Sequence, residues 1–109
     1  MTGPAWVPTI DDAKVRDGAY VAVFPKGLGV LLARVDGELY AVANKCAHMG
    51  CPLEGGLLEG PVITCPCHDW RFDVRSGQFL DAPELSITVF PTKVEDGKVL
   101  IDLAEALHG

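Results

Sequence analysis

Two stretches decide the fold of this chain: Cys46-Ala47-His48-Met49-Gly50-Cys51-Pro52-Leu53 and Cys65-Pro66-Cys67-His68-Asp69-Trp70. They contain all four cysteines and two of the three histidines. The first begins with Cys-x-His and the second contains Cys-x-x-His, and sixteen residues separate His48 from Cys65. Each stretch therefore offers one thiolate and one imidazole. Cysteines clustered in this way in an intracellular chain indicate metal or redox chemistry more often than a disulfide framework.

The sequence around these stretches predicts antiparallel strands. Asp36-Gly37 and Asp96-Gly97 each separate two apolar runs, which is typical of a two-residue type I′ hairpin. Arg75-Ser76-Gly77 marks a third hairpin, and Asp17-Gly18 precedes another strand. Helix signals are weak. Short strands with turn signals at this spacing predict an all-β fold, an antiparallel β-sandwich or small barrel.

Size and charge exclude several function classes. The 109 residues fit a single domain, residues 1–109, that can bury a core of its own. A formal net charge of −6 disfavours binding to nucleic acid or to an anionic membrane surface. No apolar stretch is long enough to cross a membrane, and no export signal is visible, so we expect a cytoplasmic protein.

On both cysteine-histidine stretches, the chain resembles the Rieske family, whose [2Fe-2S] cluster is bound by two Cys on one iron and two His on the other. The resemblance extends to several flanking segments: Pro52-Leu53, Trp70-Arg71-Phe72-Asp73, Ala82-Pro83 and Val94-Glu95-Asp96-Gly97. It implies a two-loop cluster-binding subdomain at one end of the sandwich. The basal β domain would comprise about residues 1–43 and 71–109, the cluster loops about 44–70, and a covering loop about 81–84.

The resemblance also implies the ligands of one [2Fe-2S] cluster. Cys46 and Cys65 would bind the inner iron. His48 and His68 would bind the outer iron, with their ring edges facing solvent. The third histidine, His108, lies near the end of the chain and receives no role.

The two remaining cysteines, Cys51 and Cys67, occupy matched places in the two stretches. In Rieske proteins of quinol-oxidising complexes, the equivalent cysteines form a disulfide that joins the loops. The resemblance therefore implies the same pairing here. Two small buried thiols are the alternative interpretation.

Three residues of the second stretch are candidates for tuning the reduction potential. High-potential members of the family have hydroxyl-bearing Ser and Tyr at the positions of Trp70 and Phe72. Hydrogen-bond donors to sulfur stabilise the reduced cluster, so their absence predicts a low potential. Asp69 stands where the family usually has Gly. Its position predicts an unusual φ angle, which Asp tolerates better than most residues, and its charge would disfavour reduction. Core packing of the two rings and a solvated turn for Asp69 are the alternative interpretations.

Three residues near the loops are candidates for an apolar docking rim: Met49, Leu53 and Pro83. The first two flank the ligands, and Pro83 would lie in the covering loop. Ordinary loop packing would explain all three residues equally well.

The resemblance implies a small soluble one-electron carrier, monomeric in isolation, that passes electrons from a reductase to an oxygenase or similar acceptor. We expect no enzymatic activity from the chain alone. One alternative is the small subunit of an NAD(P)H nitrite reductase-like complex. An alternative of another class is an interaction module stapled by zinc, which also binds two Cys and two His. Zinc fingers usually pair like ligands, whereas each stretch here mixes Cys and His.

Overall fold

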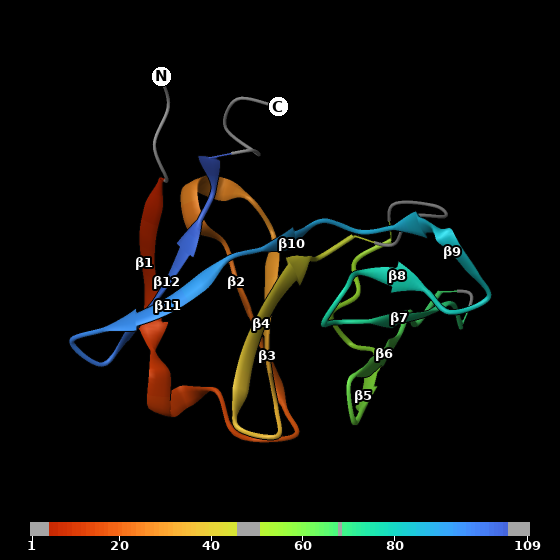
Figure 1. Cartoon of the computed structure of the whole chain (residues 1–109), viewed down its shortest axis with the longest axis horizontal. Helices are drawn as coiled ribbons and strands as arrows, with labels where there is room; N and C mark the ends of the chain where they lie inside the picture. Colours follow the sequence, from red (N-terminus) through yellow and green to blue (C-terminus); the bar gives the residue numbers. More distant parts are fainter. Residues whose placement is uncertain (1–4, 46–50, 68, 105–109) are drawn as a thin grey trace.

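The computed structural model describes residues 5–45, 51–67 and 69–104, and these residues form three antiparallel sheets (Figure 1). The first sheet contains, in order, β1 (Trp6–Asp11), β12 (Lys98–Asp102) and β11 (Thr92–Glu95). The second contains β10 (Val89–Phe90), β4 (Glu38–Ala43), β3 (Val30–Val35) and β2 (Tyr20–Val23). The third contains β5 (Leu57–Glu59), β6 (Val62–Thr64), β7 (Arg71–Asp73), β8 (Gln78–Phe79) and β9 (Ala82–Ser86). Two short 3-10 helices, η1 (Asp12–Lys14) and η2 (Pro25–Gly27), connect the first strands. The all-β prediction is therefore confirmed.

The predicted hairpins form where Asp-Gly pairs supply positive φ angles. Asp36 and Gly37, with φ of 51° and 83°, connect β3 to β4. Asp96 and Gly97, with φ of 53° and 77°, connect β11 to β12. Because two consecutive positive φ angles match the twist of the flanking strands, both turns fix the register of their hairpins.

Strand β3 is buried on both faces because it lies between two hydrophobic cores. Leu31 and Ala33 face the first core, and Val30 and Leu32 face the second. The first core also receives side chains from the five-stranded sheet, and the second receives side chains from the three-stranded sheet. The four-stranded sheet is therefore the shared wall that holds the other two sheets, as Figure 1 shows.

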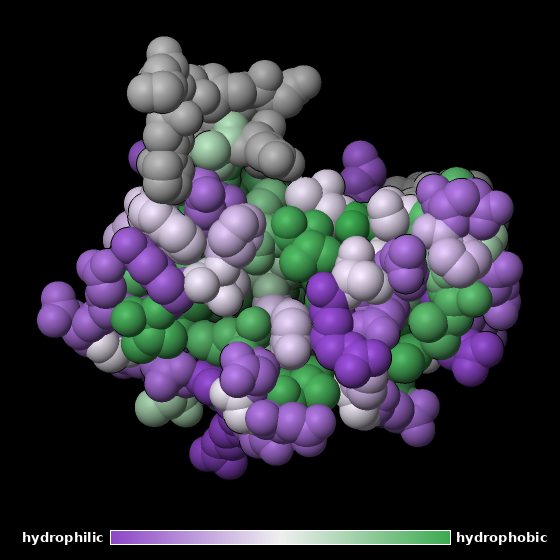
Figure 2. All heavy atoms as spheres, viewed as in Figure 1, coloured by the Kyte–Doolittle hydropathy of each residue, from purple (hydrophilic) through white to green (hydrophobic). Residues whose placement is uncertain are grey.

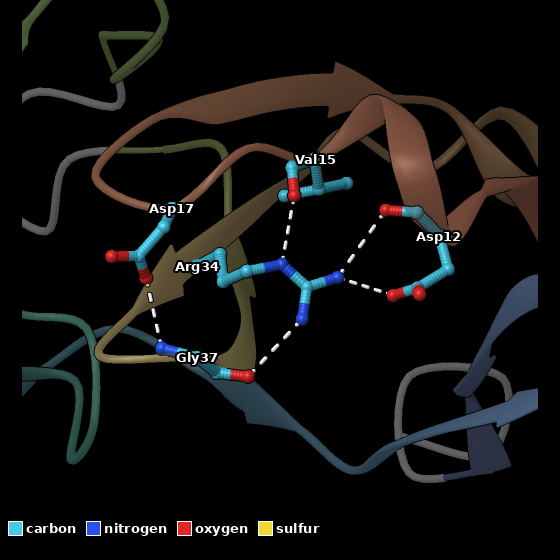
Figure 3. A network of polar contacts seen from close by, with 5 residues as sticks. All are labelled: Asp12, Val15, Asp17, Arg34 and Gly37. Carbon is cyan, nitrogen blue, oxygen red and sulfur yellow. Dashed lines mark hydrogen bonds and ion pairs between the residues drawn. The ribbon is translucent and has the colours of Figure 1, made fainter.

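Arg34, near the C-terminal end of β3, links the segment between β1 and β2 to the β3–β4 hairpin (Figure 3). Arg34 donates hydrogen bonds to the carbonyl oxygens of Val15, Asp12 and Gly37, and it forms an ion pair with the Asp12 carboxylate. Asp17 accepts a hydrogen bond from the Gly37 amide at 2.8 Å. One guanidinium thus satisfies carbonyls from two segments that do not pair as strands.

The sheets divide the chain differently from the sequence-based boundaries. The sequence-based division assigns residues 71–109 to the basal domain, with a covering loop near 81–84, whereas β7, β8 and β9 pair with β5 and β6 in the five-stranded sheet. Phe72 explains the difference, because it lies opposite Ile63 and Phe79, and all three side chains enter the first core. The site is therefore supported by a sheet and not by loops alone.

Candidate metal centre

The described residues contain one of the four expected ligands, Cys65, together with both partners of the expected disulfide. Cys46, His48 and His68 lie outside the described residues, as does the docking-rim candidate Met49. The part of the second stretch around Cys65 can therefore be tested for its fit to a cluster.

Cys65 directly follows β6 and is fully buried in the first core. Its amide donates a hydrogen bond to the Trp70 carbonyl at 2.7 Å, and its carbonyl accepts one from the Asp69 amide at 3.0 Å. These two hydrogen bonds join the backbone of Cys65 to those of Asp69 and Trp70. Cys65 is the free cysteine among the described residues. A buried sulfur held at a strand end is a soft donor, which fits the inner ligand of an iron–sulfur cluster.

A disulfide joins the two stretches. Cys51 pairs with Cys67, and their Cα atoms lie 6.5 Å apart. The bond connects positions sixteen residues apart in sequence, each close to expected ligands. The pairing implied by the resemblance is confirmed, and the alternative of two separate thiols is not.

Asp69 adopts the predicted unusual backbone conformation. Its φ is 59°, in the left-handed region that Asp enters more readily than most residues. This conformation allows its amide to turn back toward the Cys65 carbonyl. The backbone prediction for Asp69 is confirmed, whereas its effect on a reduction potential stays a prediction.

Trp70 and Phe72 belong to a cluster of three aromatic rings. Trp70 stacks on Phe79 with ring centroids 4.0 Å apart and planes within 2°. Phe72 is fully buried and lies 5.6 Å from Phe79 and 6.4 Å from Trp70, tilted against both rings. Offset and tilted ring pairs of this kind stabilise a core beyond their buried area. Core packing therefore accounts for both aromatic side chains.

The structure corrects one member of the expected docking rim. Leu53 has no exposed surface, because its side chain packs in the first core. Pro83 is exposed in β9, and its role in docking stays a prediction.

Exposed leucines that the sequence analysis missed lie elsewhere on the five-stranded sheet, at Leu57, Leu80 and Leu85. On the viewed face, Figure 2 shows apolar surface among hydrophilic residues over this part of the molecule. Strands of two to five residues carry too short an alternation to tell which leucines point outward.

An ion pair at the end of β7 supports the loop that leads away from the site. Arg75 hydrogen-bonds the Asp73 carboxylate through Nε at 3.0 Å and through a terminal nitrogen at 2.8 Å. The side-chain hydrogen bond from Arg75 holds the pKa of Asp73 below its ordinary value, against the opposing effect of partial burial. The carboxylate is therefore charged at neutral pH and fixes the turn into β8.

Two residues that the sequence analysis missed contact the turn that follows the first stretch. Tyr20 and Asn44 hydrogen-bond the turn from 53 to 56, which follows Cys51. In the sequence, Tyr20 resembles any half-buried strand residue. The Gly55-Gly56 pair was the available signal, and it identifies a turn without identifying what holds the turn.

Within the described residues, no helix has the length and apolar character needed to cross a membrane.

Comparisons with known proteins agree with this architecture. A family model described as the Rieske [2Fe-2S] domain matches residues 5–91. The ferredoxin component of a naphthalene 1,2-dioxygenase system from Pseudomonas putida is 37% identical over 100 residues, covering 91% of this chain and 96% of the relative. The biphenyl dioxygenase ferredoxin subunit from Pseudomonas sp. (strain KKS102) is 37% identical over 98 residues, covering 87% and 90%.

Solved structures have the same fold. The terminal oxygenase of carbazole 1,9a-dioxygenase from Nocardioides aromaticivorans IC177 has a TM-score of 0.81 and 32% identity, and it matches 91% of this chain. This chain spans 30% of that oxygenase chain. In the complex of reduced oxygenase and oxidized ferredoxin of carbazole 1,9a-dioxygenase, the matching chain has a TM-score of 0.81 and 27% identity, with 92% of this chain and 94% of that chain covered.

The family match argues against the alternative of a zinc-stapled module, because the matched family is defined by an iron–sulfur cluster. The two relatives that are 37% identical cover 91% and 87% of this chain, and 96% and 90% of their own lengths. The chain therefore belongs to the Rieske [2Fe-2S] domain family and carries one Rieske-type [2Fe-2S] cluster.

Proposed function

We propose that this chain is a one-electron carrier that takes an electron from a reductase and delivers it to an oxygenase. One observation carries the proposal: the chain covers 96% of a relative that is named as the ferredoxin component of a dioxygenase system. The match to one terminal oxygenase covers 30% of the oxygenase chain, whereas the match to the ferredoxin component covers 96% of that relative.

The proposed ligands are Cys46 and Cys65 on the inner iron, with His48 and His68 on the outer iron. The complete burial of Cys65 supports its place on the inner iron. When bound, the cluster takes up and releases one electron, and two imidazoles in place of two thiolates make that uptake easier than at a four-cysteine site. The chain's own residues hold the ligands in place: the Cys51–Cys67 disulfide joins the two stretches, and the first core excludes water behind Cys65.

Partners would dock at the end of the molecule that carries His48 and His68. The formal net charge of −6 favours partners with basic docking faces. Association with such partners would slow as salt concentration rises, because salt screens the attraction between opposite charges. We propose a cytoplasmic location and a monomer for the isolated carrier. Nothing in the described residues favours the nitrite reductase subunit over this carrier.

An EPR-monitored redox titration of the purified protein tests the proposal. We expect a rhombic Rieske-type signal that appears on reduction below about −100 mV, within the lower part of the family's range. Protein pre-reduced with dithionite should then be reoxidised anaerobically by a Rieske oxygenase faster at low salt than at high salt. Protein that contains iron and sulfide but gives no Rieske signal at any potential would overturn the proposal, as would a signal without electron delivery to any oxygenase tested.

A further inference from the structure

The hydroxyl of Tyr20 makes two hydrogen bonds to a turn that is distant in sequence. It accepts a hydrogen bond from the Gly55 amide at 2.9 Å and donates one to the Gly56 carbonyl at 2.7 Å. Tyr20 begins β2 in the four-stranded sheet, whereas the turn from 53 to 56 belongs to the first cysteine-histidine stretch and the segment after it. A single side chain of the four-stranded sheet, called the basal sheet below, thus satisfies both a donor and an acceptor of this turn.

The turn also contacts the backbone of Thr64, the residue that directly precedes the second stretch. A Cβ atom at Gly56 would lie 2.0 Å from the Thr64 carbonyl oxygen, so only glycine allows this approach. Thr64 directly precedes Cys65, the described cluster ligand. On its other side, the turn begins two residues after Cys51, whose disulfide reaches Cys67. The turn that Tyr20 holds therefore follows Cys51 in the sequence and lies against the residue that precedes Cys65.

A second residue, Asn44, holds the same turn and directly follows β4. Asn44 accepts a hydrogen bond from the Glu54 amide through its side-chain oxygen at 2.9 Å. Its own amide donates to the Gly29 carbonyl at 3.0 Å, which fixes Asn44 to the residue before the start of β3. Leu53 anchors the start of the turn by complete burial in the first core. Asn44 and Leu53 thus hold the beginning of the turn, and Tyr20 holds its end.

We infer that Tyr20 is a positioning residue for electron transfer: its hydroxyl locks the turn from 53 to 56 to the basal sheet and so fixes the surroundings of the cluster. The inference rests on the proposed function. Fast electron transfer needs a site whose surroundings change little on reduction, and the electrostatics around such a site act best when preorganised. Phenylalanine keeps the ring that packs against the first core but supplies neither hydrogen bond.

The test compares Tyr20→Phe with Tyr40→Phe in cluster-loaded protein. Tyr40 is a matched control, since its ring also packs against the first core and its hydroxyl has no hydrogen-bond partner within the described residues. In Tyr20→Phe we expect the amides of a peptide covering 52–58 to exchange with solvent roughly two- to tenfold faster, as the loss of one or two hydrogen bonds predicts. We also expect faster cluster release to a chelator, a broadened Rieske EPR signal and a shifted reduction potential. Tyr40→Phe should match the wild type in all four measurements.

The outcomes separate this inference from the proposed function. Wild-type protein without a Rieske signal overturns the carrier and this role together. A normal wild-type signal with Tyr20→Phe equal to Tyr40→Phe in potential and EPR line shape overturns only the role of Tyr20. Cluster release that rises merely in proportion to global unfolding, measured by urea denaturation of the same variants, would reduce Tyr20 to a stability residue and overturn the inference too.

Discussion

At the residue scale, the second stretch combines a tight backbone with an aromatic core. Asp69 turns the chain at a positive φ, and Cys65 and Phe72 are buried in the same core. The rings of Trp70, Phe72 and Phe79 contact one another and carry no hydroxyl group. None of the three rings therefore offers the hydroxyl donor of the high-potential members of the family.

Replacing Phe72 with Tyr should raise the reduction potential. A hydroxyl at this position supplies a hydrogen-bond donor like the one in high-potential members of the family, and such donors stabilise the reduced cluster. Because Phe72 is fully buried, the added oxygen should also cost about 1–3 kcal/mol of stability. An EPR-monitored redox titration measures the potential, with Phe79→Tyr as the control from the same ring cluster. An unchanged potential in folded Phe72→Tyr would contradict the missing-hydroxyl explanation.

Replacing Trp70 with Ser should raise the potential further, but at a larger cost in stability. Serine offers the second hydroxyl of the high-potential pattern. Loss of the ring stacked on Phe79 should cost about 2–3 kcal/mol, less than for a fully buried aromatic ring, because Trp70 is only partly buried. The double variant with Phe72→Tyr should have the highest potential of the series. Equal potentials for the single and double variants would argue against additive hydroxyl donors.

Asp73 predicts a pH-dependent contribution to stability. Its folded pKa is lowered, chiefly by the side-chain hydrogen bond from Arg75, so the unfolded chain binds the proton more readily. The stabilisation is therefore present above the unfolded pKa near 3.9 and is lost as pH falls through the lower folded value. Asp73→Asn should lose about 0.5–1 kcal/mol at pH 7, because Arg75 is partly exposed to solvent. Thermal unfolding followed by circular dichroism should show the gap closing at acidic pH; a gap independent of pH would contradict the assignment.

At the scale of elements, a glycine turn sets how β7 and β8 connect in the five-stranded sheet. Gly77 ends the connection from β7 to β8 with φ of 78°, and its amide donates a hydrogen bond to the Asp73 carbonyl at 2.6 Å. Its carbonyl accepts the Ile87 amide at 2.8 Å, which brings the chain after β9 against this turn. Gly37, in the β3–β4 hairpin, has a similar φ of 83° but open space around it.

Gly37 and Gly77 both have positive φ, but only Gly77 has close backbone neighbours. Alanine substitutions at the two positions therefore distinguish the cost of backbone strain from that of a steric clash. Gly77→Ala should be strongly destabilising, because its Cβ would lie 2.2 Å from the Ile87 carbonyl oxygen. Gly37→Ala bears the positive φ alone and should cost about 1–2 kcal/mol. Urea denaturation of the two variants tests the comparison. Equal losses of stability would mean that the close approach at Gly77 relaxes at little cost.

At the scale of the whole molecule, the four-stranded sheet holds one sheet on each side, and the disulfide joins the two stretches at the cluster end (Figure 1). Tyr20 and Asn44 connect that end to the basal sheet through hydrogen bonds. The cluster end is therefore restrained twice, by a covalent bond within it and by polar contacts beneath it.

Removing the disulfide should weaken the whole cluster end. The double variant Cys51→Ala with Cys67→Ala opens a loop of sequence separation 16, for which chain entropy predicts a loss of about 3 kcal/mol. Cluster release should accelerate, and more steeply in combination with Tyr20→Phe, because the disulfide restrains Cys51 and the tyrosine restrains the turn that follows it. Unfolding and chelator-release measurements test this, with dithiothreitol-treated wild type as the control. Unchanged release in the cysteine variant would contradict a clamping role for the bond.

Local chemistry explains what the sequence by itself determined. Asp-Gly pairs specify hairpins because few residues accept consecutive positive φ angles, and the position of Asp69 predicted its φ for the same reason. The mixed Cys and His pattern, through its resemblance to a known family, determined the cluster and the pairing of Cys51 with Cys67. These properties depend on residue types and short spacings.

Only the tertiary structure decided which surfaces meet. It buried Leu53, which the sequence suggested for a docking rim, and it brought residues 71–86 into the sheet that supports the site. It also directed the Tyr20 hydroxyl to Gly55 and Gly56, thirty-five and thirty-six residues away. Contacts between distant strands depend on how two cores fill a shared sheet, and a one-dimensional pattern of short strands carries no record of that packing.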